Sequence, residues 1–142
     1  MTCDFTFADE NSLFSTPGVD IGLFCSTPAV ALARCGCNPR LVKEMLFTGR
    51  RVQAKEALQN GLISRICGDP EAEAKEFAQN IASKSSSAIK LGKRVYYQQV
   101  TQNDLKKAYE TATKGMIDNC STLDANEGIS AFIQKRPPVW ID

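Results

Sequence analysis

The chain has 142 residues, in which 17 lysines and arginines almost balance 16 aspartates and glutamates, and it contains no histidine. This length fits one domain, the apolar content of 43% favours a folded core over disorder, and the balanced charge gives no long-range attraction to nucleic acid or anionic membranes. The lack of histidine excludes every Ser-His-Asp and Cys-His catalytic arrangement. No apolar stretch approaches the ~20 residues of a membrane span, and we expect neither nucleic-acid nor membrane partners.

Three short strands are expected in the N-terminal part of the chain. Apolar and polar side chains alternate over residues 3–7, which is typical of a strand with one buried face. A turn at residues 9–12 leads to a second strand at residues 13–15, and residues 62–66 predict a third. Strands this short do not form a stable sheet alone, so the pattern indicates part of a larger unit.

Two helices are expected between the second and third strands. Asn38-Pro39 suits an N-cap and first helical position, and apolar side chains follow at helical spacing up to Thr48-Gly49. Residues 54–60 predict a shorter helix. Gly61 is expected to end it, because glycine adopts a left-handed C-cap conformation without steric cost.

The remainder of the chain is expected to be helical. Asp69 can cap a helix with Pro70 at its first position, Ser85 can begin the next, and Ser121-Thr122 can cap the last. Apolar stripes recur along these segments, and we interpret them as core packing. The stripes comprise Ala74, Phe77, Ala78, Ile81 and Ala82; Leu91 and Val95; Leu105, Ala108, Tyr109, Ala112 and Met116; and Ile129, Phe132 and Ile133.

The cysteines do not indicate a disulfide framework or a metal site. Six of them are scattered through a sequence whose opening residues show neither a secretory signal nor a transit peptide, so reduced thiols are expected. Cys35-Gly36-Cys37 offers only two of the four ligands of a structural zinc, and the chain contains no C-x-x-C pair. We therefore expect no bound metal.

Two longer patterns in the sequence are those of a known family. The first runs Leu46-Phe47-Thr48-Gly49-Arg50-Arg51-Val52-Gln53-Ala54-Lys55-Glu56-Ala57 and continues with Gly61-Leu62-Ile63. The second is the tail Glu127-Gly128-Ile129-Ser130-Ala131-Phe132-Ile133-Gln134-Lys135-Arg136. With these patterns the chain resembles the crotonase, or enoyl-CoA hydratase/isomerase, family over essentially its whole length.

The resemblance implies an alpha-rich α/β fold. Residues 1–67 would form the C-terminal part of the spiral crotonase core, with a few short strands, and residues 68–142 the helical trimerisation region. The ligand or substrate would be a coenzyme A thioester, with no other cofactor. The chain would assemble as a homotrimer or with other crotonase chains, and a mitochondrial location is implied in the same way.

The resemblance also implies that the catalytic groups of a hydratase are missing. Both peptide N–H groups of the family oxyanion hole, and the first of its two catalytic glutamates, would precede Met1. The second glutamate falls at Gly18, which has no group to donate or accept a proton. Asp20 is a conceivable substitute whose direction the sequence leaves open. The glycine-rich loop of the family is replaced by Ser26-Thr27-Pro28, which implies a stiffer backbone and a different substrate preference.

Three residues are candidates for CoA or substrate binding. Lys135 matches the family lysine that reaches CoA phosphates, although a solvated lysine at a helix end is the alternative. Met116 stands where the family places an aromatic near the adenine, and Phe24 could line an acyl pocket, but core packing would explain either. Cys25 and Ser26 would lie beside the thioester as lining, because no base accompanies them.

The combined expectation is an acyl-CoA-binding protein linked to fatty-acid metabolism, with no catalytic residue of its own and no hydratase activity in this form. One alternative is an enoyl-CoA hydratase-like lyase, decarboxylase or thioesterase whose catalytic groups are supplied upstream in a full-length chain. A second is a non-catalytic subunit that assembles with other crotonase chains. A third is a piece of a longer chain in which Met1 is an internal methionine.

Overall fold

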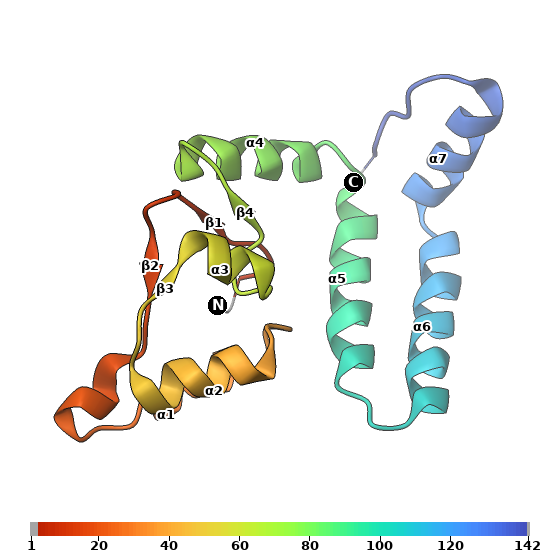
Figure 1. Ribbon diagram of the computed structural model, residues 1–142. Coiled ribbons are helices and arrows are strands. Elements are labelled where there is room, and N and C mark those ends of the chain that lie inside the picture. Colours follow the sequence, from red (N-terminus) through yellow and green to blue (C-terminus); the bar gives the residue numbers. More distant parts are fainter. Residues whose placement is uncertain (1–2, 142) are drawn as a thin grey trace. The chain divides into compact units, whose positions relative to one another are not determined.

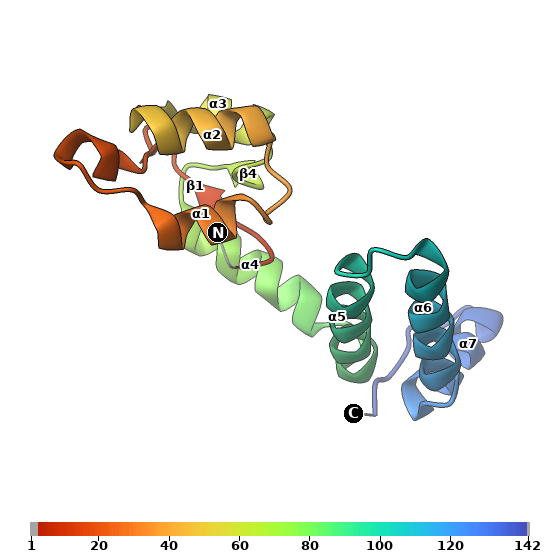
Figure 2. The ribbon, with the colours of Figure 1, turned by 90° about the horizontal axis from the view of Figure 1, so that it is seen from below.

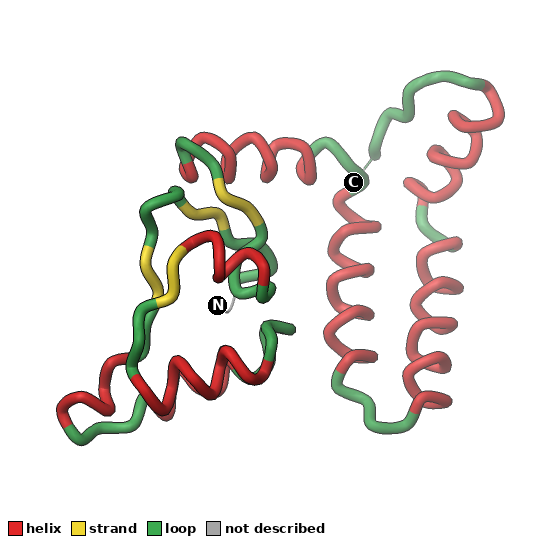
Figure 3. Tube along the Cα trace, in the orientation of Figure 1, coloured by secondary structure: helices red, strands yellow, loops and turns green. Residues whose placement is uncertain are grey.

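The computed structural model describes residues 3–141, which divide into two compact units, unit 1 up to Glu76 and unit 2 from Phe77 (Figure 1). The expected alpha-rich chain with a few short strands is confirmed, as the tube in Figure 3 makes plain. The predicted boundary between residues 67 and 68 lies just before the helix that links the units in sequence.

The elements are β1 (Phe7–Ala8), β2 (Leu13–Phe14), the 3-10 helix η1 (Pro17–Ile21), α1 (Ser26–Leu32), α2 (Pro39–Thr48), β3 (Val52–Gln53), α3 (Ala54–Gln59), β4 (Arg65–Ile66), α4 (Pro70–Ala82), α5 (Ser86–Val100), α6 (Leu105–Cys120) and α7 (Leu123–Gln134).

The strands of unit 1 form two separate two-stranded sheets. β1 pairs in parallel with β4, Phe7 opposite Arg65, and β2 pairs antiparallel with β3, Phe14 opposite Val52. All three predicted strands are present, but each is shorter than expected, and β1 begins only at Phe7. Short pairings of this kind contribute little stability alone, so side-chain burial has to hold unit 1 together.

Three elements of unit 1, β3, η1 and α1, were not expected from the sequence. β3 has only two residues, too few for a period-two pattern to be visible. α1 contains Pro28, which usually argues against a helix. Here Pro28 lies in the first turn, where the backbone N–H groups have no helical partner and a missing donor costs nothing.

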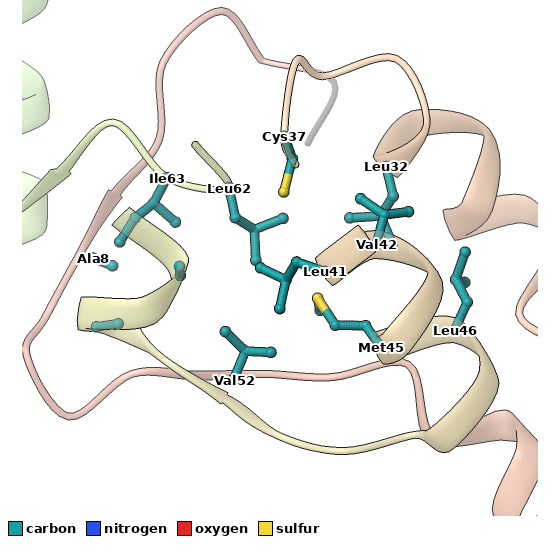
Figure 4. Close-up of a cluster of buried hydrophobic side chains, with 12 residues drawn as sticks. Ala8, Leu32, Cys37, Leu41, Val42, Met45, Leu46, Val52, Leu62 and Ile63 are labelled. Atoms are coloured by element: carbon teal, nitrogen blue, oxygen red, sulfur yellow. The ribbon is translucent and has the colours of Figure 1, made fainter. Parts of the chain in front are cut away.

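A single apolar cluster forms the core of unit 1 (Figure 4). Val52, Ala54 and Ala57 are completely inaccessible to solvent, and Met45 is 2% exposed. α2 supplies Leu41, Val42, Met45 and Leu46, the four apolar residues whose spacing predicted this helix. The cluster also includes Ala8, Leu32, Cys37, Leu62 and Ile63. Because β3 and α3 follow α2 directly, the segment that carries the family pattern is also the centre of the core.

The ends of the helices follow the predicted caps. The Asn38 side chain accepts the Arg40 backbone N–H, and the Asp69 carboxylate accepts those of Glu71 and Ala72. Ser85 and Thr122 cap α5 and α7 in the same way. These bonds satisfy the N–H groups that a helix start leaves without partners, so the sequence signal and the physical cause coincide.

Unit 2 is built on the antiparallel pair α5 and α6, with α7 packed against both (Figures 1 and 2). At the closest approach Gly115 of α6 faces Val95 of α5, and a Cβ at position 115 would overlap the Val95 side chain. The start of α7 is tied down by Asp124, a buried carboxylate that accepts from the Ser87 hydroxyl and from the Ile141 backbone N–H.

The core-packing interpretation of the C-terminal stripes is largely wrong for this chain. On α4 no residue is buried, and on α6 only Gly115 is. Leu91 and Val95 of α5 are partly buried, as expected. The side chains of Leu105, Tyr109, Met116, Ile129, Phe132 and Ile133 are more than half exposed. Periodicity identified which face of each helix is apolar, but the described chain offers no second layer to cover those faces. No helix within residues 3–141 has the length and apolarity to cross a membrane.

The contact at Gly115 predicts opposite effects of two glycine substitutions. Gly92 lies inside α5 with no atom near the position of a Cβ, so Gly92→Ala should raise the free energy of unfolding by about 0.5–1 kcal/mol. Gly115→Ala should lower it by about 1–3 kcal/mol, because the added methyl must push α5 and α6 apart. Urea unfolding of both variants tests this, and equal stability of the two would contradict the close helix approach.

Candidate functional site

The turn around Gly18 has no space for a side chain at that position. η1 is closed by a hydrogen bond of 2.9 Å from the Leu23 backbone N–H to the Gly18 carbonyl. Gly22 makes the reversal possible with a φ of 77°. A Cβ on residue 18 would lie 2.7 Å from the Leu23 carbonyl oxygen and 2.9 Å from the Cys25 sulfur. Position 18 therefore lacks both an acid group and the volume to accommodate one.

The same turn is anchored to the end of α2. The Thr16 hydroxyl, which is buried, donates a 2.9 Å hydrogen bond to the Met45 carbonyl. Gly49 ends α2 with a φ of 67°, and a Cβ there would lie 3.2 Å from both Asp20 carboxylate oxygens. The open question about Asp20 is thus answered, since its carboxylate lies against Gly49 at the C-terminus of α2. It remains exposed to solvent.

Phe24 lies on the surface of unit 1 next to a second aromatic ring. Its side chain is 49% exposed, and its ring centroid is 6.1 Å from that of Phe47, which is itself exposed. Core packing is therefore the wrong explanation of Phe24 within the described chain. The Ser26 hydroxyl donates to the Phe24 carbonyl at 3.3 Å, and Cys25 is partly buried. The rings of Phe24 and Phe47 form an apolar surface beside the closed turn.

The Thr-Gly-Arg pattern has a structural explanation. The Arg50 guanidinium makes bidentate hydrogen bonds to Glu44, at 2.8 and 3.2 Å, and to Glu56, at 3.0 and 2.6 Å. These bonds hold the pKa of Glu56 below its ordinary value and raise that of Arg50. Both carboxylates are occupied by the same guanidinium, so they connect α2 to α3 through Arg50. The pattern was visible in the sequence, but the pairing of Arg50 with the two glutamates was not anticipated.

The tail pattern is explained by a second bidentate pair. Arg136 donates to Glu127 at 2.6 and 2.8 Å, and the Val139 backbone N–H donates to the same carboxylate at 2.8 Å. Together they lower the pKa of Glu127 to about 2. Gly128 leaves room for the ring of Trp140, whose indole N–H donates to the Ser83 carbonyl at 2.9 Å. The segment after α7 is thereby folded back along its own helix.

Lys135 lies at the point where the chain reverses. It ends α7 in the left-handed conformation with a φ of 53°, the one non-glycine residue within residues 3–141 with a positive φ. Its side chain is exposed, whereas the neighbouring Arg136 is engaged by Glu127. Met116 of α6 is 62% exposed, so it is not a core residue of this chain. Both belong to unit 2, and Phe24 belongs to unit 1.

No cluster of three or more potential metal ligands occurs in the part of the chain that the structure describes. All six cysteines are free thiols. The expected absence of a bound metal stays a prediction.

Comparison with known proteins shows which family the two sequence patterns belong to. The sequence profile described as "Enoyl-CoA hydratase/isomerase" matches residues 1–142. The enoyl-CoA hydratase domain-containing protein 3, mitochondrial, of Rattus norvegicus is 52% identical over 142 residues, and that of Homo sapiens 50% over 144 residues. The carnitinyl-CoA dehydratase of Escherichia coli (strain SMS-3-5 / SECEC) is 31% identical over 146 residues. The matches cover 98%, 98% and 99% of this chain but only 46%, 46% and 56% of these relatives, so the chain spans about half their length.

Solved structures show the same fold. The crystal structure of human enoyl coenzyme A hydratase domain-containing protein 3 matches with a TM-score of 0.91 and 46% identity, over 97% of this chain and 55% of that one. An enoyl-CoA hydratase from Mycobacterium smegmatis matches with a TM-score of 0.91 and 36% identity, over 97% and 54% of the two chains. The resemblance to the crotonase fold is confirmed.

The closed turn predicts that position 18 does not tolerate even a methyl group. Gly18→Ala should lower the free energy of unfolding by about 1–3 kcal/mol, because the Leu23 carbonyl and the Cys25 sulfur must move. Gly68→Ala is the matched control, since no atom lies within 4 Å of a Cβ there, and it should be close to neutral. Thermal and urea unfolding measure both. A Gly18→Glu variant as stable as the parent would show that the turn has room after all.

The Glu127 pair predicts a defined pH dependence. Because the folded-state pKa of about 2 is below the ordinary value of 4.5, the pair stabilises the chain above pH 4.5 and loses its effect as the pH falls toward 2. Glu127→Gln should therefore unfold at lower urea concentration than the parent at pH 6, and the gap should close progressively below pH 4.5. A gap that is the same at pH 6 and pH 3 would contradict this assignment.

Proposed function

The chain belongs to the enoyl-CoA hydratase/isomerase family, and on that basis we propose that it is an acyl-CoA-binding protein of fatty-acid metabolism that does not hydrate enoyl-CoA in this form. The observation that carries the proposal is the pair of contrasting backbone features at positions 18 and 135. Gly18 leaves no room for a catalytic side chain, and Lys135 presents a cation where the chain reverses direction after α7.

Lys135 supports the binding part of the proposal. A left-handed conformation costs a residue with a Cβ roughly 1–2 kcal/mol, and glycine is the usual choice at this cap position. Because Lys135 occupies a strained conformation that glycine would adopt without cost, we infer that its side chain has a role at this position. The Glu127–Arg136 pair holds the chain reversal in place. An exposed ammonium suits a phosphate group as a point charge. Met116 would add an apolar contact for the adenine, and Phe24 one for the acyl chain.

The absence of hydration follows from the groups around the closed turn. Hydration of an enoyl thioester needs positioned acid–base groups and electrostatic stabilisation of an enolate. Gly18 has no side chain, Asp20 lies against Gly49, and Glu44 and Glu56 are both held by Arg50. None of these carboxylates is placed as a free general acid beside Phe24.

Two other functions remain open. A longer form of the protein would be a hydratase-like lyase if its additional residues supplied the catalytic groups, and the name of the E. coli relative, a carnitinyl-CoA dehydratase, favours this alternative. The chain would instead be a non-catalytic subunit if the exposed apolar faces of α6 and α7 packed against other crotonase chains or in a homotrimer. The names of the vertebrate relatives favour a mitochondrial location.

Thermal unfolding with and without free CoA tests the binding. A ligand of the native state at 100 times its dissociation constant adds about 2.7 kcal/mol to the free energy of unfolding, so CoA should raise the midpoint. Lys135→Gly should raise the midpoint of the unliganded chain by relieving the left-handed strain, yet reduce its shift with CoA by more than half. Lys84→Glu, an exposed lysine of unit 2 outside both patterns, is the control and should shift like the parent.

Two outcomes would contradict the proposal. An unchanged CoA shift in Lys135→Gly, or no shift in a cooperatively unfolding parent chain, would remove the binding role. Turnover of crotonyl-CoA by the purified 142-residue chain would remove the claim that this form does not hydrate.

A further inference from the structure

Cys35 and Cys37 form a thiol pair at the junction between α1 and α2. Only Gly36 separates them, and its φ of 81° turns the backbone sharply between the two cysteines. Both side chains lie against the same apolar cluster, Cys37 as a buried member and Cys35 as a partly buried neighbour. Residues two apart in a tight turn have Cα atoms within the range that a disulfide can bridge, so little backbone movement is needed to join the sulfurs.

The two thiols differ in their exposure. Cys37 is 6% exposed, and in Figure 4 its sulfur points into the apolar cluster toward Leu62 and Val42. Cys35 is only partly buried, and its thiol donates to the Leu32 carbonyl at 3.3 Å. Burial and the neighbouring Cys35 raise the pKa of the Cys37 thiol. A reagent in solvent therefore meets Cys35 first.

The loop that carries the pair is held on one side by α3 and the residues after it. The Asn38 backbone N–H donates to the Asn60 carbonyl at 2.9 Å, and the two side-chain amides are joined at 3.0 Å. A Cβ on Gly61 would lie 3.6 Å from the Gly36 carbonyl oxygen, so the turn also packs against that glycine. The fold thus restrains the turn on the side of Asn60 and Gly61 and keeps both cysteines against one apolar cluster.

We propose that Cys35 and Cys37 are a reversible thiol–disulfide exchange site that reacts with small-molecule disulfides. The Cys35 thiolate attacks one sulfur of the reagent, and the other sulfur leaves as a thiolate. Cys37 then loses its proton and attacks Cys35, which releases the second half of the reagent as a thiol. The two cysteines are oxidised by two electrons and the reagent is reduced to two thiols. This site is independent of the CoA-binding proposal.

Glutathione exchange followed by peptide mass measurement tests the site. Trypsin cuts after Arg34 and Arg40, so both cysteines fall in the peptide of residues 35–40. After equilibration with defined ratios of glutathione disulfide to glutathione, free thiols are alkylated and this peptide is weighed. The closed form lacks two hydrogens and takes no alkyl group. It should appear in the native chain at a disulfide-to-thiol ratio at least ten times lower than in the same chain in urea, because the fold restrains the turn and keeps both cysteines against one apolar cluster.

If the Cys35–Cys37 disulfide forms no more readily in the native chain than in urea, the proposed exchange site is wrong and the two cysteines are ordinary packing residues. A stable glutathione adduct on Cys35 without ring closure would do the same. Cys37→Ser should stop at that adduct, and Cys120→Ser, which changes an exposed cysteine on α6, should close like the parent.

Two glycine variants distinguish an effect of the Gly36 turn on disulfide formation from an effect of general destabilisation of the chain. Gly36 and Gly22 both have a left-handed φ, 81° and 77°, and neither has an atom within 4 Å of a Cβ position. Gly36→Ala and Gly22→Ala therefore introduce the same backbone strain. Only Gly36→Ala should raise the glutathione disulfide ratio needed for closure, by at least threefold. Equal effects of the two variants would mean that the turn does not hold the thiols together and would overturn the inference.

Discussion

Because no strand of the described chain is longer than two residues, burial around Val52 and Met45, rather than backbone pairing, has to hold unit 1 together. The apolar face of α2 is the largest contributor to this cluster, and β3 and α3 complete it immediately afterwards in sequence. The Thr16 hydrogen bond to the Met45 carbonyl then attaches η1 to the same helix. The closed turn at Gly18 is in this way anchored to the core of unit 1.

The proposed function rests on the backbone at two positions. At Gly18 the Leu23 carbonyl and the Cys25 sulfur occupy the volume that a side chain would need, so the turn has no room for a glutamate. At Lys135 the reverse holds, because a side chain is retained where glycine would be less strained. The left-handed Lys135 is a departure from local preference, and such departures concentrate at functional sites.

Unit 2 has a different balance of forces. α5 and α6 approach closely at Gly115, and the tail is pinned by Asp124, Glu127 and Trp140, yet one face of α6 and of α7 stays apolar and exposed. Polar interactions of these side chains thus stabilise the fold of unit 2, while the apolar faces of α6 and α7 are largely exposed. Exposed apolar faces of this kind commonly mark an interaction surface.

The sequence by itself determined most of the helices, several of their N-caps and the family, because the signals for these lie in residues close together in the chain. Asn38, Asp69, Ser85 and Thr122 act on backbone groups two or three residues away, and the spacing of apolar residues reveals a helix without knowledge of what covers it. Only the tertiary structure decided the direction of Asp20, the closure over Gly18, the pairing of Arg50 and the exposure of Met116 and Phe24. Each of these depends on segments that meet in space, or on a covering layer that is absent, and neither leaves a periodic trace in the sequence.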